Sequence, residues 1–418
     1  MAPLKILVSG ASIAGSTTAY WLAKGGARVT VIERAPSLRT AGQGIDVEGP
    51  ALDVIKRMGL EEEVRRAGTN EAGITYVDEQ GKQFATFDTE DKGNNVGFTS
   101  EIEIMRGDLA GLLFGAADAL AGVEYRFGTT IKSLDQRGDG VRVHFSKGAE
   151  EDFDIVVGAE GLGSPTRGLI LPESNTAACY FSLGGYVGYF SVPREPQDAP
   201  RSRFYQTVGR RSILIRPRNE TISSVYLGVI QDTAELKEAS SAGVVAQKEL
   251  LTKMFQDVQY PELKRVLRGM EEADDFYFQH VAQVRLEHWY AGRGVLVGDA
   301  AYAPSPFSGQ GTPLAIQGAY VLAGEISSSP AEPDVAFRKY EEKMKPFVKT
   351  AQSLSMDGLT PKLLNPESAW GLWVLRNIVW IVANSGVLRL GAFVRWLTAR
   401  GEERRIQLPD YNFHGEII

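Results

Sequence analysis

The sequence contains very little cysteine and histidine, and this scarcity limits the chemistry it can carry. Its one cysteine, Cys179, cannot form a disulfide within the chain, so cysteine gives no sign of an oxidising compartment. The four histidines show neither an HxH nor an HxxxH spacing, which argues against a histidine-based metal site. We therefore expect no resident metal ion.

Excess positive charge and long apolar runs are also absent. The formal net charge of -7 argues against nucleic-acid binding, which depends on clustered Lys and Arg. No apolar run reaches the ~18 residues that a membrane-spanning helix needs, and the N-terminal run is too short for a secretory signal. The apolar segment 371–397 is interrupted by arginines and asparagines, so we expect amphipathic helices packed on the body, with an interfacial membrane anchor as the alternative. These patterns favour a cytoplasmic protein without membrane contact.

The N-terminus has the pattern of a strand, a tight turn, a helix and a second strand. The turn reads GASIAG, in which Gly10 permits the bend and Gly15 lets the helix pack close to the sheet. Ser12 stands where the dinucleotide fingerprint usually has glycine. The helix N-terminus would bind a pyrophosphate, and Glu33, 23 residues after Gly10, would bind an adenosine ribose. Because a carboxylate repels a 2′-phosphate, NAD or FAD is favoured over NADP.

A second glycine-rich box, GDAAYAPSPFSGQGT, occupies residues 298–312 between an apolar strand pattern and a helical one. A simple NAD dehydrogenase has no need for it, whereas FAD is long enough to require a second contact at its ribitol and flavin. Asp299 can accept a hydrogen bond from a ribitol hydroxyl. Backbone N–H groups from Gly309 to Thr312 can face the flavin, where a helix N-terminus would stabilise negative charge. Together the two boxes predict an FAD site.

The chain is predicted to be an α/β protein in which a Rossmann-like FAD-binding domain is interrupted by an antiparallel-sheet substrate domain. Alternation of apolar and polar residues in FYQTVG, SILIRP and TISSVYLGVI indicates antiparallel strands. The predicted division gives an FAD-binding domain of residues 1–75, 101–175 and 285–345, a substrate-binding domain of residues 76–100 and 176–284, and a C-terminal helical cover of residues 346–418.

Four stretches carry a family resemblance: GASIAG with Glu33, MRGDLAGLL, DIVVGAEGLGSPTR and GDAAYAPSPFSGQG. In this order they resemble the para-hydroxybenzoate hydroxylase family, the single-component class A FAD-dependent monooxygenases. Within that family the chain is similar to tetracycline-inactivating and fungal polyketide-tailoring members. Three positions differ from the residues frequent in the family, namely Glu160 (aspartate), Tyr302 (histidine) and Pro313 (asparagine).

The resemblance implies an enzyme that uses O2, with NADH or NADPH as transient co-substrate, to oxygenate a hydrophobic aromatic or polyketide-like molecule through a flavin C4a-hydroperoxide. Hydroxylation, epoxidation and Baeyer–Villiger oxidation stay open, and no catalytic base is assigned. The predicted cofactor-binding residues are Gly10, Ser12, Ile13, Ala14, Gly15, Glu33, Arg34, Gly44, Asp46, Arg106, Glu160, Gly298, Asp299, Pro306, Gly309, Gln310, Gly311 and Thr312. The predicted substrate contacts are Tyr205, Arg216 and Phe307.

Three alternatives stay open at this point. The first is a flavin-dependent oxidoreductase of the same fold that desaturates, cyclises or reduces without inserting oxygen. The second is an NAD-binding dehydrogenase or regulatory Rossmann protein, which the second glycine box disfavours. The third is a membrane-associated binding protein that uses residues 371–397.

Overall fold

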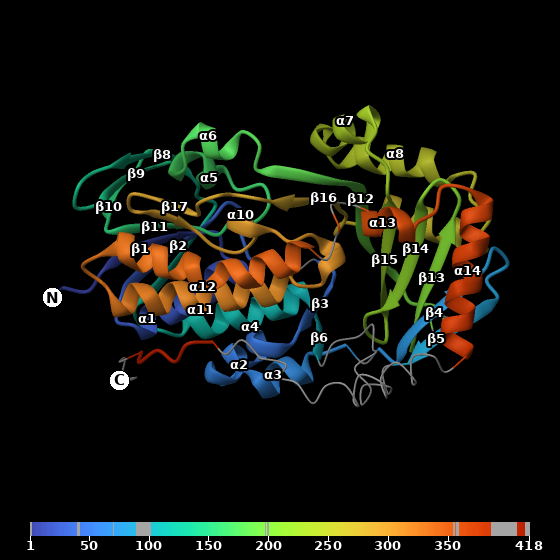
Figure 1. The fold of residues 1–418 in the computed structure, drawn as a ribbon, viewed down its shortest axis with the longest axis horizontal. Coiled ribbons are helices and arrows are strands. Elements are labelled where there is room, and N and C mark those ends of the chain that lie inside the picture. Colours follow the sequence, from blue (N-terminus) through green and yellow to red (C-terminus); the bar gives the residue numbers. More distant parts are fainter. Residues whose placement is uncertain are drawn as a thin grey trace.

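Two large β-sheets form the body of the protein (Figure 1). This computed structural model describes residues 2–39, 42–69, 71–88, 102–196, 198, 200–353, 356, 359–385 and 408–413. Helices pack around the first sheet, and the second sheet lies at the other end of the molecule (Figure 1). The mixed α/β class predicted from the sequence is confirmed.

The first sheet has six strands in the order β17-β18-β11-β1-β2-β7. Their bounds are β1 (Lys5–Ser9), β2 (Arg28–Glu33), β7 (Val123–Phe127), β11 (Ile155–Gly158), β17 (Tyr290–Ala291) and β18 (Gly294–Leu296). All neighbouring pairs are parallel except β17 with β18. Ile6, Leu7 and Val8 of β1 are fully buried, as expected for a parallel strand covered on both faces.

Helices α1, α4, α11 and α12 pack against one another beside this sheet (Figure 1). The helices of this half are α1 (Ile13–Lys24), α2 (Gly49–Arg57), α3 (Glu61–Arg66), α4 (Arg106–Asp118), α5 (Pro165–Ile170), α6 (Glu173–Thr176), α10 (Asp299–Tyr302), α11 (Gly311–Ser328) and α12 (Pro333–Ser353). A smaller antiparallel sheet contains β8 (Ile131–Gln136), β9 (Val141–Phe145) and β10 (Glu150–Phe153). The predicted strand–turn–helix–strand unit is therefore present as β1, α1 and β2.

The second sheet has seven strands in the order β16-β12-β15-β14-β13-β4-β5. Their bounds are β4 (Gly73–Val77), β5 (Gln83–Asp88), β12 (Tyr180–Pro193), β13 (Ser202–Thr207), β14 (Arg211–Pro217), β15 (Ile222–Val229) and β16 (Tyr277–Val284). The three segments predicted as antiparallel strands are β13, β14 and β15. Three helices belong to this half: α7 (Ala234–Ala242), α8 (Val244–Phe255) and α9 (Leu263–Glu272).

The two halves meet at a short antiparallel pair, β3 (Gly44–Val47) with β6 (Ile102–Met105). Three of the predicted domain boundaries fall inside elements, at residue 75 within β4, at residue 175 within α6 and at residue 345 within α12. The chain switches between halves repeatedly, because β4 and β5 join the second sheet before α4 returns to the first.

The described C-terminal part contains α13 (Leu359–Leu364) and α14 (Ala369–Asn384). α14 packs against β5 and β13, where Leu372 is buried, while more than half of the surface of Trp370, Trp373 and Trp380 is exposed. Residues 386–397 of the predicted amphipathic segment lie outside the described residues. Across the described ranges no helix combines the length and the apolar character needed to cross a bilayer. The interfacial anchor stays an untested alternative.

Candidate functional site

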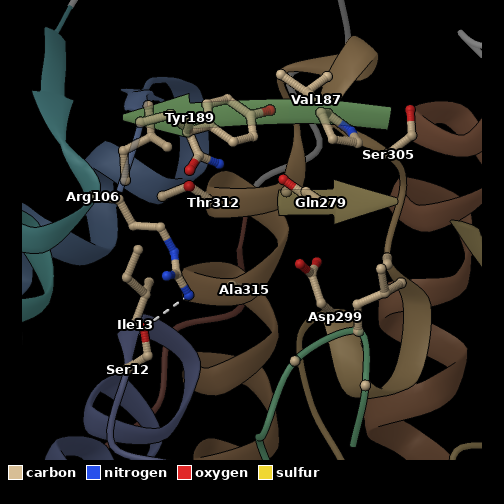
Figure 2. A pocket seen from close by; sticks show the side chains of 18 of the residues that line it. Ser12, Ile13, Arg106, Val187, Tyr189, Gln279, Asp299, Ser305, Thr312 and Ala315 are labelled. Atoms are coloured by element: carbon tan, nitrogen blue, oxygen red, sulfur yellow. Dashed lines mark hydrogen bonds between the residues drawn. The ribbon is translucent and has the colours of Figure 1, made fainter. Parts of the chain in front are cut away.

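A cavity of about 580 Å³ is lined by both large sheets and by the loops at the carboxyl ends of β1, β2 and β11. This is where parallel α/β sheets bind ligands, since helix N-termini and irregular loops gather there. Figure 2 shows Arg106 and Asp299 facing each other across the cavity, with Val187, Tyr189 and Gln279 of the second sheet above them.

The first glycine turn brings the start of α1 to the cavity. Gly10 has φ of +109°, and a Cβ there would lie 2.6 Å from the carbonyl oxygen of Ala159 on the neighbouring strand. Ser12 is the N-cap of α1, and its side chain does not cap the helix. The first N–H groups of α1 are therefore free of a side-chain cap and favour an anion.

Glu33 stands at the end of β2 on the cavity wall, as predicted. Its Oε2 accepts a hydrogen bond from the N–H of Ala11 at 3.1 Å, and its Oε1 accepts one from the N–H of Ala35 at 2.9 Å. These bonds fix the carboxylate beside the first glycine turn, and each oxygen keeps capacity for another donor.

The second glycine turn touches the first. A Cβ on Gly298, which has φ of +64°, would lie 2.9 Å from the Cβ of Ala14. Two segments almost three hundred residues apart therefore meet in van der Waals contact at the N-terminus of α1. A single elongated ligand could contact both.

Asp299, which follows this turn, has no hydrogen-bond partner among the described residues. Burial raises the pKa of the Asp299 carboxyl, and the nearby Arg106 guanidinium partly opposes that rise. Arg106 in turn donates from Nη2 to Ser12 Oγ at 3.1 Å, drawn as the dashed line in Figure 2. A half-buried carboxylate that faces a cavity without a protein donor is completed most favourably by a ligand hydroxyl.

The loop before α11 forms another wall of the cavity. It contains the short 3-10 helix η2 (Pro306–Ser308) and Gly309, which has φ of +66°. Ser305 has φ of +98° although it is not glycine, and such strained backbone is concentrated at ligand sites. Gly311 and Thr312, at the N-terminus of α11, also line the cavity.

The second sheet supplies a wall that is mainly apolar with a few polar groups. Val187, Tyr189, Phe204 and Leu214 line it together with Arg216, Tyr226 and Gln279. The Oε1 atom of Gln279 is buried without a hydrogen-bond partner in the described structure. Phe307, at the rim, lines the cavity and is 40% exposed.

Tyr205 does not contribute to this wall, and its prediction as a substrate contact was wrong. Its ring stacks on Tyr260 with centroids 4.6 Å apart, and its hydroxyl donates to the Gln259 carbonyl at 3.1 Å. Side chains alternate along a strand, so Phe204 faces the cavity and Tyr205 faces the core on the opposite side.

Most of the other predicted site residues line the cavity. They are Gly10, Ser12, Ile13, Ala14, Glu33, Arg34, Gly44, Asp46, Arg106, Glu160, Asp299, Pro306, Phe307, Gly309, Gly311, Thr312 and Arg216. Gly15, Gly298 and Gln310 do not line it. Gly15 packs against the backbone of Gly10, and the Gln310 side chain donates to Glu48 Oε1 at 2.9 Å.

Glu160 has structural partners that sequence reasoning did not foresee. Its Oε1 accepts from Ser9 Oγ at 2.6 Å, and its Oε2 accepts from Ser164 Oγ at 2.7 Å and from the N–H of Thr166 at 3.0 Å. The carboxylate therefore joins the end of β1 to the start of α5. Because Ser9 directly precedes Gly10, these hydrogen bonds fix the residue from which the first glycine turn starts.

Sequence reasoning also missed Tyr189, Tyr226 and Gln279. The alternation along β12 and β15 could have identified the two tyrosines as members of one face, but not which face meets a ligand. Nothing local distinguishes Gln279, because its position depends on β16 pairing with β12.

Comparison with known proteins agrees with this geometry. Residues 4–354 match the family model described as "FAD binding domain". The chain is 41% identical over 420 residues to "Monooxygenase CTB7" of Cercospora beticola, covering 98% of each chain, and 34% identical over 431 residues to "Flavin-dependent monooxygenase eupH" of a Phoma species, again covering 98% of each. The tetracycline destructase Tet(51) superposes with a TM-score of 0.78 at 29% identity, covering 99% of this chain and 100% of that one.

Proposed function

This chain belongs to the FAD-binding-domain family of flavin-dependent monooxygenases, and from that premise we propose that it uses NADH or NADPH and O2 to oxygenate a hydrophobic aromatic or polyketide-like molecule. That it is an FAD-dependent monooxygenase follows from the family. The reductant, the substrate class and the residue roles are our proposal. The contact of Gly298 with Ala14 supports it most directly, because it joins both glycine turns at one cavity.

The residues present fit FAD. The uncapped N-terminus of α1 would bind the pyrophosphate and Glu33 the adenosine ribose. Asp299, a half-buried carboxylate without a protein donor, would accept a hydrogen bond from ribitol, while Arg106 would balance its charge. The N-terminus of α11 at Gly311 would face the flavin.

Reduced flavin supplies the activation of O2, so the protein has to hold the substrate and keep water away. The apolar side chains of Val187, Tyr189, Phe204 and Leu214 suit a hydrophobic ring system. Arg216 and Tyr226 offer donors to an acidic or phenolic oxygen, which sets the orientation of the ring. This wall favours a polycyclic hydroxylated substrate, and the tetracycline destructases, whose names state that they act on tetracycline, support the same class.

The test is a screen of phenolic and polyketide compounds with purified enzyme. We expect at least one compound to accelerate NADH or NADPH oxidation and to give a product heavier by one oxygen atom. Reaction under ¹⁸O2 should place the heavy isotope in that product. Turnover that yields a desaturated or cyclised product without ¹⁸O would instead establish the oxidoreductase alternative.

A further inference from the structure

A buried ion cluster lies at the junction of the two halves, directly behind the cavity wall. Arg216 Nε lies 3.1 Å from Glu71 Oε2, and Arg216 Nη2 forms ion pairs with both Glu71 and Glu103. The Glu71 and Glu103 side chains are only 5% and 10% exposed. Arg216 lines the cavity, so this guanidinium connects the buried carboxylates to the ligand site.

The charged groups around Glu103 come from three different elements. Arg216 lies on β14, Glu71 precedes β4, and Asp46 stands opposite Glu103 in the β3–β6 register. Tyr226 of β15 packs against Arg216, with the guanidinium carbon 5.9 Å from the ring centroid. These are the groups that set the electrostatic environment of Glu103.

The cluster contains more carboxylates than cations. With Glu71 and Glu103 both ionised, Arg216 would balance only one of them, and burying the excess charge is costly. Arg216 Nη2 contacts one oxygen of each carboxylate, so Glu71 and Glu103 lie close together, and a proton on one of them relieves their repulsion. Burial raises the pKa of Glu103 to about 7, with Arg216 lowering it and Glu71 and Asp46 raising it further.

Resting on the proposed function, we propose that Glu103 is a positioning residue whose proton decides whether Arg216 can pair with an anionic oxygen of the substrate, such as a phenolate or enolate. With Glu103 protonated, Arg216 has one ionised partner, Glu71, and can accept the substrate anion as a second. With Glu103 ionised, the two carboxylates compete with the substrate for Arg216 and repel it. Binding of the anion therefore takes one proton from solvent onto the Glu103 carboxylate, and no substrate bond forms or breaks in this step.

The test uses FAD-loaded enzyme and 2-naphthoate, which stays anionic between about pH 5.5 and 8.5, with neutral 2-naphthamide as its counterpart. Binding is followed by the change in flavin absorbance. We expect the naphthoate Kd to be about tenfold higher at pH 8 than at pH 6, because one proton is taken up near pH 7. The naphthamide Kd should be independent of pH, Glu103→Gln should bind naphthoate equally well at both pH values, and the exposed control Glu238→Gln should behave like wild type.

The inference would be overturned if naphthoate did not bind, or if it bound no more tightly at pH 6 than at pH 8. It would also be overturned if the Glu103→Gln variant kept the pH dependence of the naphthoate Kd. A second readout needs no ligand: the infrared band of a protonated carboxyl, taken as wild type minus Glu103→Gln, should disappear between about pH 6 and 8. Persistence of this band at pH 8 or its absence at pH 6 also counts against the inference. Enzyme that shows both effects but never oxygenates a compound would refute the proposed function alone.

Discussion

At the scale of single residues, the cavity depends on charges that are removed from water and face one another. Asp299 and Arg106 form one such pair across the predicted FAD site, and Glu103 and Arg216 form another behind the substrate wall. In both pairs, burial penalises the ionised carboxylate and a guanidinium compensates. Substitution of Asp299 should therefore change FAD affinity, and substitution of Glu103 should change the pH dependence of stability, whereas substitution of an exposed carboxylate should change neither.

Replacing Asp299 with alanine should weaken FAD binding by about 1–3 kcal/mol, roughly 5- to 150-fold, because a hydrogen-bond acceptor for the cofactor is lost and Arg106 is left unbalanced. Flavin fluorescence during titration of the apoprotein measures the Kd. Asp53→Ala, on the exposed side of α2, is the matched control and should bind like wild type. An unchanged FAD affinity in Asp299→Ala would remove the assigned role.

The raised pKa of Glu103 also predicts a pH dependence of stability. A carboxyl whose folded pKa lies above its ordinary value contributes stability at low pH, and this contribution is lost as pH rises through about 7. Glu103→Gln should therefore melt at a higher temperature than wild type at pH 8, by roughly 2–5 °C, and the difference should vanish near pH 5. Thermal unfolding at both pH values checks this, and a difference independent of pH would contradict it.

At the scale of elements, the site is made by turns that allow strands and helices to approach closely. Gly298 meets the N-terminus of α1, and Gly10 meets the end of β11. Gly44 of β3 leaves room for the Glu103 carboxylate, because a Cβ there would overlap Glu103 Oε1. Glycine at position 44 is thus explained by packing against the ion cluster, in addition to its place on the cavity wall.

Gly298→Ala tests whether the close approach of the two glycine turns is needed for FAD binding. The new methyl would lie 2.9 Å from the Ala14 Cβ, so the two glycine turns must move apart. We expect a loss of about 1–3 kcal/mol in stability and a clear drop in FAD retained on purification. Gly59→Ala is the matched control, since Gly59 has φ of +75° with no atom within 4 Å of an added Cβ. If both variants retain FAD equally, contact between the turns is not needed for the cofactor.

Sequence patterns located the elements of the site better than its side chains. The turns at Gly10 and Gly298 have local signatures, and the period-two alternation identified β13 to β15. Alternation does not say which face of a strand meets the ligand, so Tyr205 was placed on the wrong side and Phe204 was missed. Which face of the strand meets the ligand depends on the elements that pack against each face in the folded protein.

At the scale of the whole molecule, the cavity lies where the two sheets meet. One wall comes from the loops of the parallel sheet and the other from the face of the seven-stranded sheet. A dinucleotide bound at the first wall would thus form one side of the substrate pocket, whose other side the second sheet provides. Family membership excludes the NAD-dehydrogenase alternative considered from the sequence.

FAD should therefore stabilise the folded protein more than ADP, which is only part of the FAD molecule, stabilises it. A ligand at 100 times its Kd adds about 2.7 kcal/mol to the free energy of unfolding. We expect saturating FAD to raise the Tm of the apoprotein clearly, and ADP, which can occupy only the α1 end near Glu33, to raise it less. Thermal shift assays measure both. Equal shifts from ADP and FAD would mean that the second glycine turn contributes nothing to cofactor binding.

The sequence by itself determined the two glycine turns, Glu33 at the end of β2, Asp299 after β18, and the parallel and antiparallel halves, because each depends on neighbours a few residues apart. The order of these motifs along the chain then indicated the flavin family. The tertiary structure alone decided that Ala14 meets Gly298, that Glu160 bridges Ser9 to α5, and that Arg216 pairs with Glu71, 145 residues away. Contacts of this kind are set by how whole elements pack, and no local pattern encodes the partner.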